Sequence, residues 1–116
     1  MMETKLVQSI VIKTEAKVST VKYRKKVNGE RREYKLYFVR FSKDASIKLE
    51  KMGVRKLKNV EIIYEDEKYV LGSMSVRIWS RTSNDNTALY GLTLPKPIGE
   101  KLAGKKVLVL AEIESK

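Results

Sequence analysis

Seven cations and two tyrosines are crowded into residues 22–35, and this stretch is the part of the chain best suited to a chemical task. Lysine and arginine side chains neutralise the phosphates of a nucleic acid, and aromatic rings offer flat surfaces to its bases or sugars. Only Glu30 and Glu33 oppose these cations. The stretch therefore predicts a nucleic-acid-binding surface made of Lys22, Tyr23, Arg24, Lys25, Lys26, Arg31, Arg32, Tyr34 and Lys35.

A second, smaller group of the same kind consists of Arg77, Trp79 and Arg81, which alternate with Ile78 and Ser80. Alternation places the three side chains on one face of a strand. An aromatic ring between two guanidinium groups suits stacking and phosphate contact. A lone tryptophan is nevertheless more often part of a core or a plug at the end of a barrel, and we favour that interpretation for Trp79.

Neither catalysis nor a cofactor is expected. The chain has no histidine and no cysteine, which removes the usual general base, the commonest metal ligand and any disulfide. Four acids offer oxygens to Mg²⁺ for nuclease chemistry, namely Glu65, Asp66, Glu67 and Asp85. Consecutive acids on a strand point to opposite faces, however, so the run is better interpreted as a solvated turn. We expect a protein that is not an enzyme.

The charge of the chain is large and uneven. The formal net charge is +11, and residues 1–58 hold 17 Lys and Arg against 6 Asp and Glu, whereas residues 59–116 hold 8 of each. Such asymmetry favours a polyanionic partner, and nucleic acid is preferred to a membrane because no basic amphipathic helix is evident. The alternative is a solubilising surface, although a solubility device need not be confined to one half of the chain.

Length and hydropathy predict one soluble, cytoplasmic domain. A chain of 116 residues has room for a single core. No stretch approaches the ~20 apolar residues of a membrane-spanning helix, and no signal peptide is expected. Heavy use of lysine and glutamate with a single glutamine resembles the composition of hyperthermophile proteins.

The cations of residues 22–35 need an element to present them, and the sequence predicts a long β-hairpin. Asn28-Gly29 between two strand-like runs favours a two-residue type I′ turn, because both central positions require positive φ. This turn pairs residues whose numbers sum to 57, so that Tyr23 faces Tyr34. Near its base the hairpin is apolar on both faces, which predicts that the base is buried within a barrel. The charged tip should project into water, where a two-stranded ribbon fits the major groove of B-DNA. The alternative is a protruding hairpin whose charges prevent edge-to-edge aggregation.

Two segments of the chain, residues 36–65 and 89–112, have similar sequences, and each is predicted to form a strand–helix–strand unit. At an offset of 53, Leu36, Tyr37, Lys43, Lys48 and Leu49 match Leu89, Tyr90, Lys96, Lys101 and Leu102. At an offset of 47, Lys58, Val60 and Glu65 match Lys105, Val107 and Glu112. Chance is the alternative, because such units are common. A true duplication predicts one domain of two repeats, about 8–66 and 70–114, related by a pseudo-two-fold axis. Such a chain is either a monomeric pseudo-dimer or a homodimer.

Local signals set the elements of each unit. In the first unit, Ser42 or Asp44 caps a helix that Gly53 ends, and its apolar stripe is Ala45, Leu49 and Met52. A strand follows at Val60–Tyr64. In the second unit, a strand at 88–94 stops at Pro95-Lys96-Pro97, which opens a helix. Ile98 and Leu102 form the stripe of that helix, Gly104 ends it, and a last strand runs over 107–113.

The second unit resembles the AbrB/MazE-like swapped-hairpin family. The resemblance lies in Leu92-Thr93-Leu94-Pro95-Lys96-Pro97-Ile98-Gly99-Glu100-Lys101-Leu102 followed by Gly104-Lys105-Lys106-Val107. It implies DNA binding by an interlocked, two-fold β-barrel, as in transition-state regulators and antitoxins. The first unit departs from the motif, because Phe41-Ser42-Lys43 stands where the family has Leu-Pro-Lys. One basic and one neutral half also depart from a symmetric dimer.

The fold expected from these patterns is mainly β with two short helices, arranged as a pseudo-two-fold swapped-hairpin β-barrel with a protruding basic hairpin. The function expected is binding of duplex DNA as a transcription regulator or architectural protein. The alternatives are a protein-interaction module, such as an antitoxin-like or adaptor domain, and an RNA-binding protein.

Overall fold

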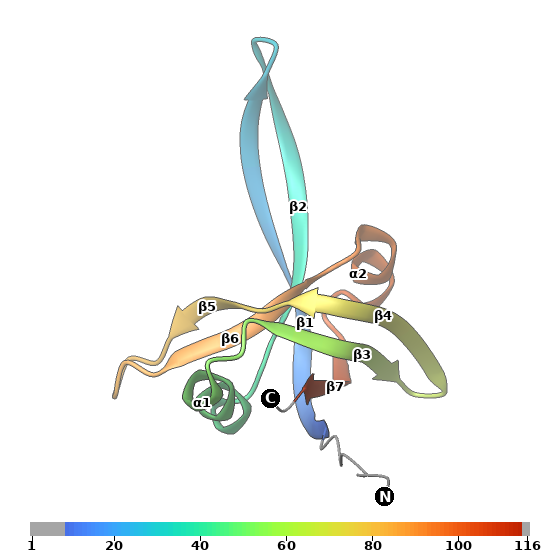
Figure 1. Ribbon diagram of the computed structural model, residues 1–116. Helices are drawn as coiled ribbons and strands as arrows, with labels where there is room; N and C mark the ends of the chain where they lie inside the picture. The colour runs from blue at the N-terminus through green and yellow to red at the C-terminus, as the bar shows by residue number, and fades with distance from the viewer. Residues whose placement is uncertain (1–8, 115–116) are drawn as a thin grey trace, which may run out of the picture.

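The computed structural model describes residues 9–114, and Figure 1 shows a body of short strands and two helices from which one long hairpin stands out. The mainly β composition with two helices is confirmed. In chain order, the elements within the described residues are β1 (Ser9–Val27), β2 (Glu30–Arg40), α1 (Lys43–Met52), β3 (Lys56–Tyr64), β4 (Glu67–Ser75), β5 (Arg77–Arg81), β6 (Ala88–Leu94), α2 (Lys96–Leu102) and β7 (Lys106–Glu114).

The strands form one antiparallel sheet in the order β4-β3-β7-β1-β2-β6-β5. The long strand β1 serves two partners in succession, because residues 9–17 pair with β7 and residues 18–27 pair with β2. Each helix packs on the strand of the other half of the chain: α1 contacts β6, and α2 contacts β2. The sheet therefore interleaves the two halves of the sequence.

The prediction of a closed barrel is wrong. The sheet has two free edges, β4 and β5. These strands meet end to end, because β4 ends at Ser75 and β5 begins at Arg77. They therefore cannot form a ladder with each other. The run from Tyr69 to Arg81 is divided into β4 and β5 at the buried Val76, whose N–H donates to the Arg55 carbonyl at 2.9 Å.

The core lies where the two halves of the chain pair with each other. Val39 of β2 faces Leu92 of β6, and Ile62 of β3 faces Val109 of β7. All four side chains are fully buried. Burial of a side chain of this size stabilises a fold by roughly 1.5–3 kcal/mol, so these pairs are central to the stability of the body.

Helix α1 has the predicted caps but a slightly rotated buried side. The Ser42 hydroxyl accepts the Ala45 N–H at 3.2 Å, and Gly53 ends the helix with φ of 65°. The buried residues are Ala45, Ser46 and Leu49. Successive residues of a helix are 100° apart, so these three positions shift the buried side of α1 toward Ser46. Met52 therefore lies at the margin of the buried side, and 40% of its surface is exposed. Placing Met52 on the apolar stripe was therefore wrong.

Helix α2 begins as expected after Pro95, with Pro97 in its first turn. Gly99 lies directly on the Tyr37 ring of β2, and a Cβ added at Gly99 would come within 2.3 Å of that side chain. The glycine thus permits the close approach of α2 to β2. Strand β6 has the predicted bounds, and Leu102 is buried as expected.

Candidate nucleic-acid interface

The hairpin of β1 and β2 extends well beyond the body (Figure 1), and the molecule measures 67 × 36 × 31 Å along its principal axes. We call residues 20–36, the outer part of this hairpin, the arm. Its predicted turn and register are confirmed. Asn28 and Gly29 have φ of 51° and 83°, as a type I′ turn requires, and Tyr23 pairs with Tyr34. All nine predicted contact residues of residues 22–35 lie on the arm.

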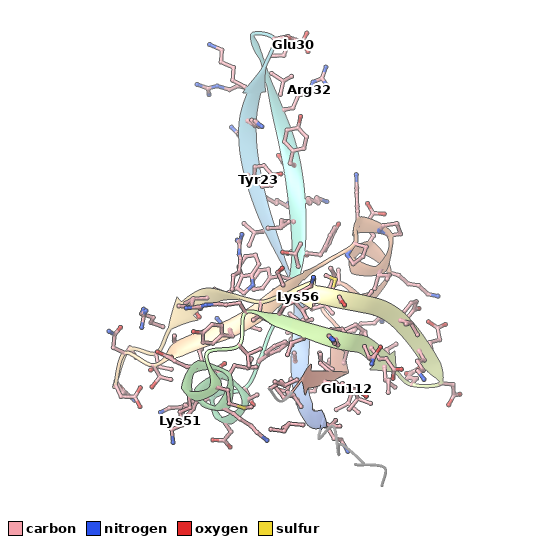
Figure 2. The ribbon with its side chains drawn as sticks, viewed as in Figure 1. Tyr23, Glu30, Arg32, Lys51, Lys56 and Glu112 are labelled. Carbon is pink, nitrogen blue, oxygen red and sulfur yellow. The ribbon has the colours of Figure 1, made fainter. Side chains whose placement is uncertain are left out.

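Strand alternation divides the arm into two faces. One face carries apolar and aromatic residues near the body, and we call it the aromatic face; it consists of Val21, Tyr23, Tyr34 and Leu36, with Lys25 and Arg32 toward the tip. The Tyr23 and Tyr34 rings stack with centroids 5.4 Å apart. The other face, the cationic face, consists of Lys22, Arg24, Lys26, Arg31 and Lys35, with Glu33 opposite Arg24. In Figure 2 the labelled Tyr23 lies midway along the arm, and Glu30 and Arg32 lie at its tip.

Three cross-strand pairs of the arm place like charges directly opposite each other. They are Lys22 with Lys35, Lys25 with Arg32, and Lys26 with Arg31. Like charges directly opposite on antiparallel strands are destabilising. The arm is therefore not arranged for its own stability, and an anion between these pairs would relieve the repulsion.

Within residues 9–114 the cations of the arm have almost no acidic partners. Among the described residues they make one ion pair, between Arg32 and Glu30 at 3.9 Å, and both side chains are largely exposed. An exposed pair at this distance contributes little. The positive charge of the arm is therefore open to an external partner.

The body differs, because several of its lysines contact acids. Lys43 contacts Asp85 at 2.6 Å, Lys68 contacts Glu61 at 3.1 Å, and Lys101 contacts Glu67 at 3.1 Å. Hydrogen bonds from Tyr69 and then Lys101 lower the pKa of the Glu67 carboxyl. The charges of these three lysines are thus compensated within the protein.

The second predicted group lies on β5 and is only partly brought together. Trp79 sits at a β-bulge, where the register of β5 against β6 shifts between Ile78 and Ser80. Its ring stacks on Phe38 with centroids 4.1 Å apart, and the Arg77 guanidinium lies 3.9 Å from the ring centroid. Two partners at such distances must occupy opposite faces of the indole. Trp79 is therefore half-buried and packs at the foot of the arm, and neither face of its ring is free to stack on a base.

Arg77 is exposed and forms the outer layer of this stack. Arg81 lies at the far end of β5, where its guanidinium donates to the Asn86 carbonyl at 3.2 Å and supports the 82–87 loop. The indole Nε1 of Trp79 is buried and has no acceptor among the described residues.

Phe38 is a site residue that the sequence reasoning did not include. It continues the aromatic face of the arm into the body, since it follows Tyr34 and Leu36 at two-residue spacing. That spacing was visible in the sequence, but its contact with Trp79 depends on β2, β6 and β5 being neighbours in the sheet.

Comparison with known proteins adds no template, because no family model and no solved structure matches this chain. Neither helix within residues 9–114 has the length and apolar character needed to cross a bilayer. Over the same residues, no three acidic side chains are grouped as metal ligands would be.

Proposed function

We propose that this protein binds nucleic acid through its arm, with duplex DNA as the preferred substrate, and acts as a transcription regulator or architectural protein. The observation that carries the proposal is the contrast between arm and body. Three lysines of the body contact acids within 3.1 Å, whereas the arm sets three pairs of cations opposite each other and presents them to solvent. Phosphates are the anions that such an array fits.

The dimensions of the arm suit the major groove. Paired strands lie about 4.8 Å apart, so a two-stranded ribbon with its side chains enters a groove about 12 Å wide. From Lys22 to Asn28 the arm extends roughly 20 Å at about 3.3 Å per residue. At an axial rise of about 3.4 Å per base pair, this length corresponds to roughly six base pairs along the helix axis. The arm therefore has room to contact several phosphates on each side of the groove.

The aromatic residues favour a duplex over a single strand. Proteins that hold unpaired bases stack them on free aromatic faces. Here the two arm tyrosines stack on each other, and Trp79 is enclosed by Phe38 and Arg77. The deep, narrow major groove of A-form RNA does not admit side chains, which favours DNA over double-stranded RNA.

We further propose that the chain is a duplicated swapped hairpin of the AbrB/MazE-like kind, with a pseudo-two-fold axis through its core. At the two offsets of the repeat, Val39 is equivalent to Leu92, and Ile62 is equivalent to Val109. These are the residues that face each other in the core. A residue that pairs with its own equivalent is what a two-fold axis between two strands requires.

The helices support the same symmetry. Ser46 of α1 and Gly99 of α2 are equivalent positions at the offset of 53. The Ser46 hydroxyl accepts the Tyr90 N–H at 2.9 Å, and Gly99 lies on the Tyr37 ring, so each helix contacts the tyrosine of the opposite unit. The arm has no such counterpart, because β5 and β6 are joined by the short 82–87 loop. One arm in a two-fold body predicts recognition of a DNA site without a palindrome.

The test is binding of a mixed-sequence DNA duplex at several salt concentrations. If five to seven arm cations meet phosphates, log K should fall against log salt with a slope of roughly −4 to −6. The variant Arg24→Ala, Lys25→Ala, Arg31→Ala, Arg32→Ala should lose most of this binding. Its matched control, Lys48→Ala, Lys51→Ala, Lys96→Ala, Lys106→Ala, removes four exposed cations of the body and should retain it.

Equal losses in the two variants would mean diffuse attraction and refute the assignment to the arm. Absence of binding to DNA and RNA at low salt would instead favour a protein-interaction module, whose basic arm docks on an acidic protein.

A further inference from the structure

The aromatic face of the arm exposes apolar surface that the body does not cover. Val21 is 40% exposed and Tyr23 is 45% exposed, beside the half-buried Tyr34 and Leu36. At the same levels the opposite face presents Lys22, Arg24 and Lys35. The middle of the arm is thus amphipathic, with an apolar face and a cationic face that are both exposed to solvent at least in part.

We propose that the aromatic face lies on the floor of the DNA major groove, against the edges of the base pairs, and that the cationic face points out of the groove. This assignment rests on the proposed function. It makes Tyr23, Tyr34 and Val21 the residues in contact with bases, and it makes the five cations of the opposite face contacts of the phosphates along the groove walls.

The chemistry of the two surfaces supports this orientation. The floor of the major groove combines thymine methyl groups with hydrogen-bonding base edges. Val21 and the tyrosine rings offer apolar surface to the methyl groups, and the tyrosine hydroxyls both donate and accept hydrogen bonds. The cations of the other face have long, flexible side chains that reach sideways, and their partners are the phosphates at the rims.

The aromatic face is also flanked by cations at both of its ends. Lys25 and Arg32 lie toward the tip, and Arg77 lies at the foot, where it covers the Phe38–Trp79 stack. From the level of Lys25 to the level of Phe38 is six residues of β1, or roughly 20 Å. In a ribbon that lies along the groove, the cations at both ends of this apolar strip reach the phosphates on either side of it.

The strip is pre-organised. The stacked tyrosines and the continuous register of the hairpin fix the rings before DNA arrives. Rigid contact residues lose little conformational entropy on binding, so they are efficient for reading a surface.

Two matched variants test the orientation, because neighbouring cross-strand pairs lie on opposite faces. The variant Tyr23→Thr, Tyr34→Thr removes one pair from the aromatic face and keeps residues that favour strands. The variant Lys22→Ala, Lys35→Ala removes the adjacent pair from the cationic face. Binding of a mixed-sequence DNA duplex is measured for both across a salt series, after circular dichroism has shown wild-type strand content.

We expect the tyrosine variant to bind roughly tenfold or more weakly at every salt concentration with an unchanged salt slope, since the slope counts phosphates and not bases. The lysine variant should have a slope less steep by about 2, or roughly 0.9 for each lost phosphate contact. A duplex with deoxyuridine in place of thymidine lacks the methyl groups. The wild type should bind this duplex more weakly than the thymidine duplex, whereas the tyrosine variant should bind both with the same affinity.

Wild-type affinity in the tyrosine variant would overturn the orientation, and so would a reduced salt slope in that variant. If the tyrosine variant loses its strand content, the variant Val21→Ser is measured in its place. A several-fold loss of DNA affinity at an unchanged salt slope supports the assignment, and wild-type affinity overturns it. These outcomes require DNA binding by the wild-type protein, so they are distinct from the failure of the proposed function, in which the wild type does not bind DNA at all.

Discussion

Lys43 and Asp85 form a short ion pair, with Lys43 Nζ 2.6 Å from Asp85 Oδ2. The contact ties the first residue of α1 to the 82–87 loop. Asp85 also accepts hydrogen bonds from the hydroxyls of Thr82 and Thr87. Hydrogen bonds from Lys43 first, and then from the two threonines, hold the pKa of the Asp85 carboxyl well below its usual range.

A depressed pKa in the folded protein predicts a pH-dependent contribution to stability. The contribution is fully present above the ordinary Asp pKa of about 3.9 and is lost as the pH falls from there toward the lower pKa of the folded state. Asp85→Asn should therefore lower the thermal midpoint at neutral pH and have little effect in strong acid. Thermal melts at the two pH values check this. A loss of equal size at both values would assign it to packing of the loop.

Lys35→Glu should strengthen the arm and weaken its function. The change places an acid opposite Lys22 and converts a repulsive cross-strand pair into an attractive one, a gain of about 0.2–1 kcal/mol or more. It also removes one phosphate contact and should reduce the salt slope of DNA binding by about 1. Amide exchange of the arm measures the first effect, and a salt series measures the second.

Lys48→Glu on α1 is the matched control, because it makes the same change of charge at an exposed position of the body. It should leave the amide exchange of the arm as in the wild type. Stronger DNA binding by the Lys35→Glu variant would contradict the role given to the arm.

Gly99→Ala should destabilise the body. Alanine in place of glycine within a helix normally stabilises by up to about 1 kcal/mol. Here the new methyl group would meet the Tyr37 side chain at 2.3 Å, and overpacking of this kind costs about 1–3 kcal/mol. Urea denaturation measures the balance. Glu100→Ala, at the next and exposed position of α2, should be close to neutral, and a stabilised Gly99→Ala variant would show that α2 does not lie on β2.

Ser46→Ala should be more costly than its small size suggests. The Ser46 hydroxyl is fully buried and accepts the Tyr90 N–H. Without it, the amide is buried with no acceptor, a loss of about 1–3 kcal/mol. Ser42→Ala, which removes the cap of the same helix, should cost about 1 kcal/mol and serves as the comparison. A neutral Ser46→Ala variant would mean that water replaces the hydroxyl.

The arm was predictable because its determinants are local. A two-residue turn at Asn28-Gly29 fixes every pair of the hairpin, so the register from Val18–Val39 to Lys26–Arg31 followed from two residues. Capping by Ser42, termination at Gly53 and the start of α2 after Pro95 were likewise set by nearby side chains.

Features that depend on partners distant in sequence were not predictable in the same way. The open sheet depends on where the run from Tyr69 to Arg81 divides, and Val76 looks like any other apolar position until Arg55 is known to lie beside it. Similarly, the Phe38–Trp79 stack requires the order of β2, β6 and β5. The requirement for glycine at position 91 also depends on this strand order, because a Cβ there would come within 2.7 Å of Trp79.

The continuity of β1 gives the arm a mechanical property. Residues 9–17 of this strand are held by β7 within the body, and the same strand runs on without a register shift into the arm. The arm is therefore a cantilever clamped in the core. A force applied at its tip acts as a torque on the β1–β7 ladder, so a bound duplex and the body would turn together as one lever.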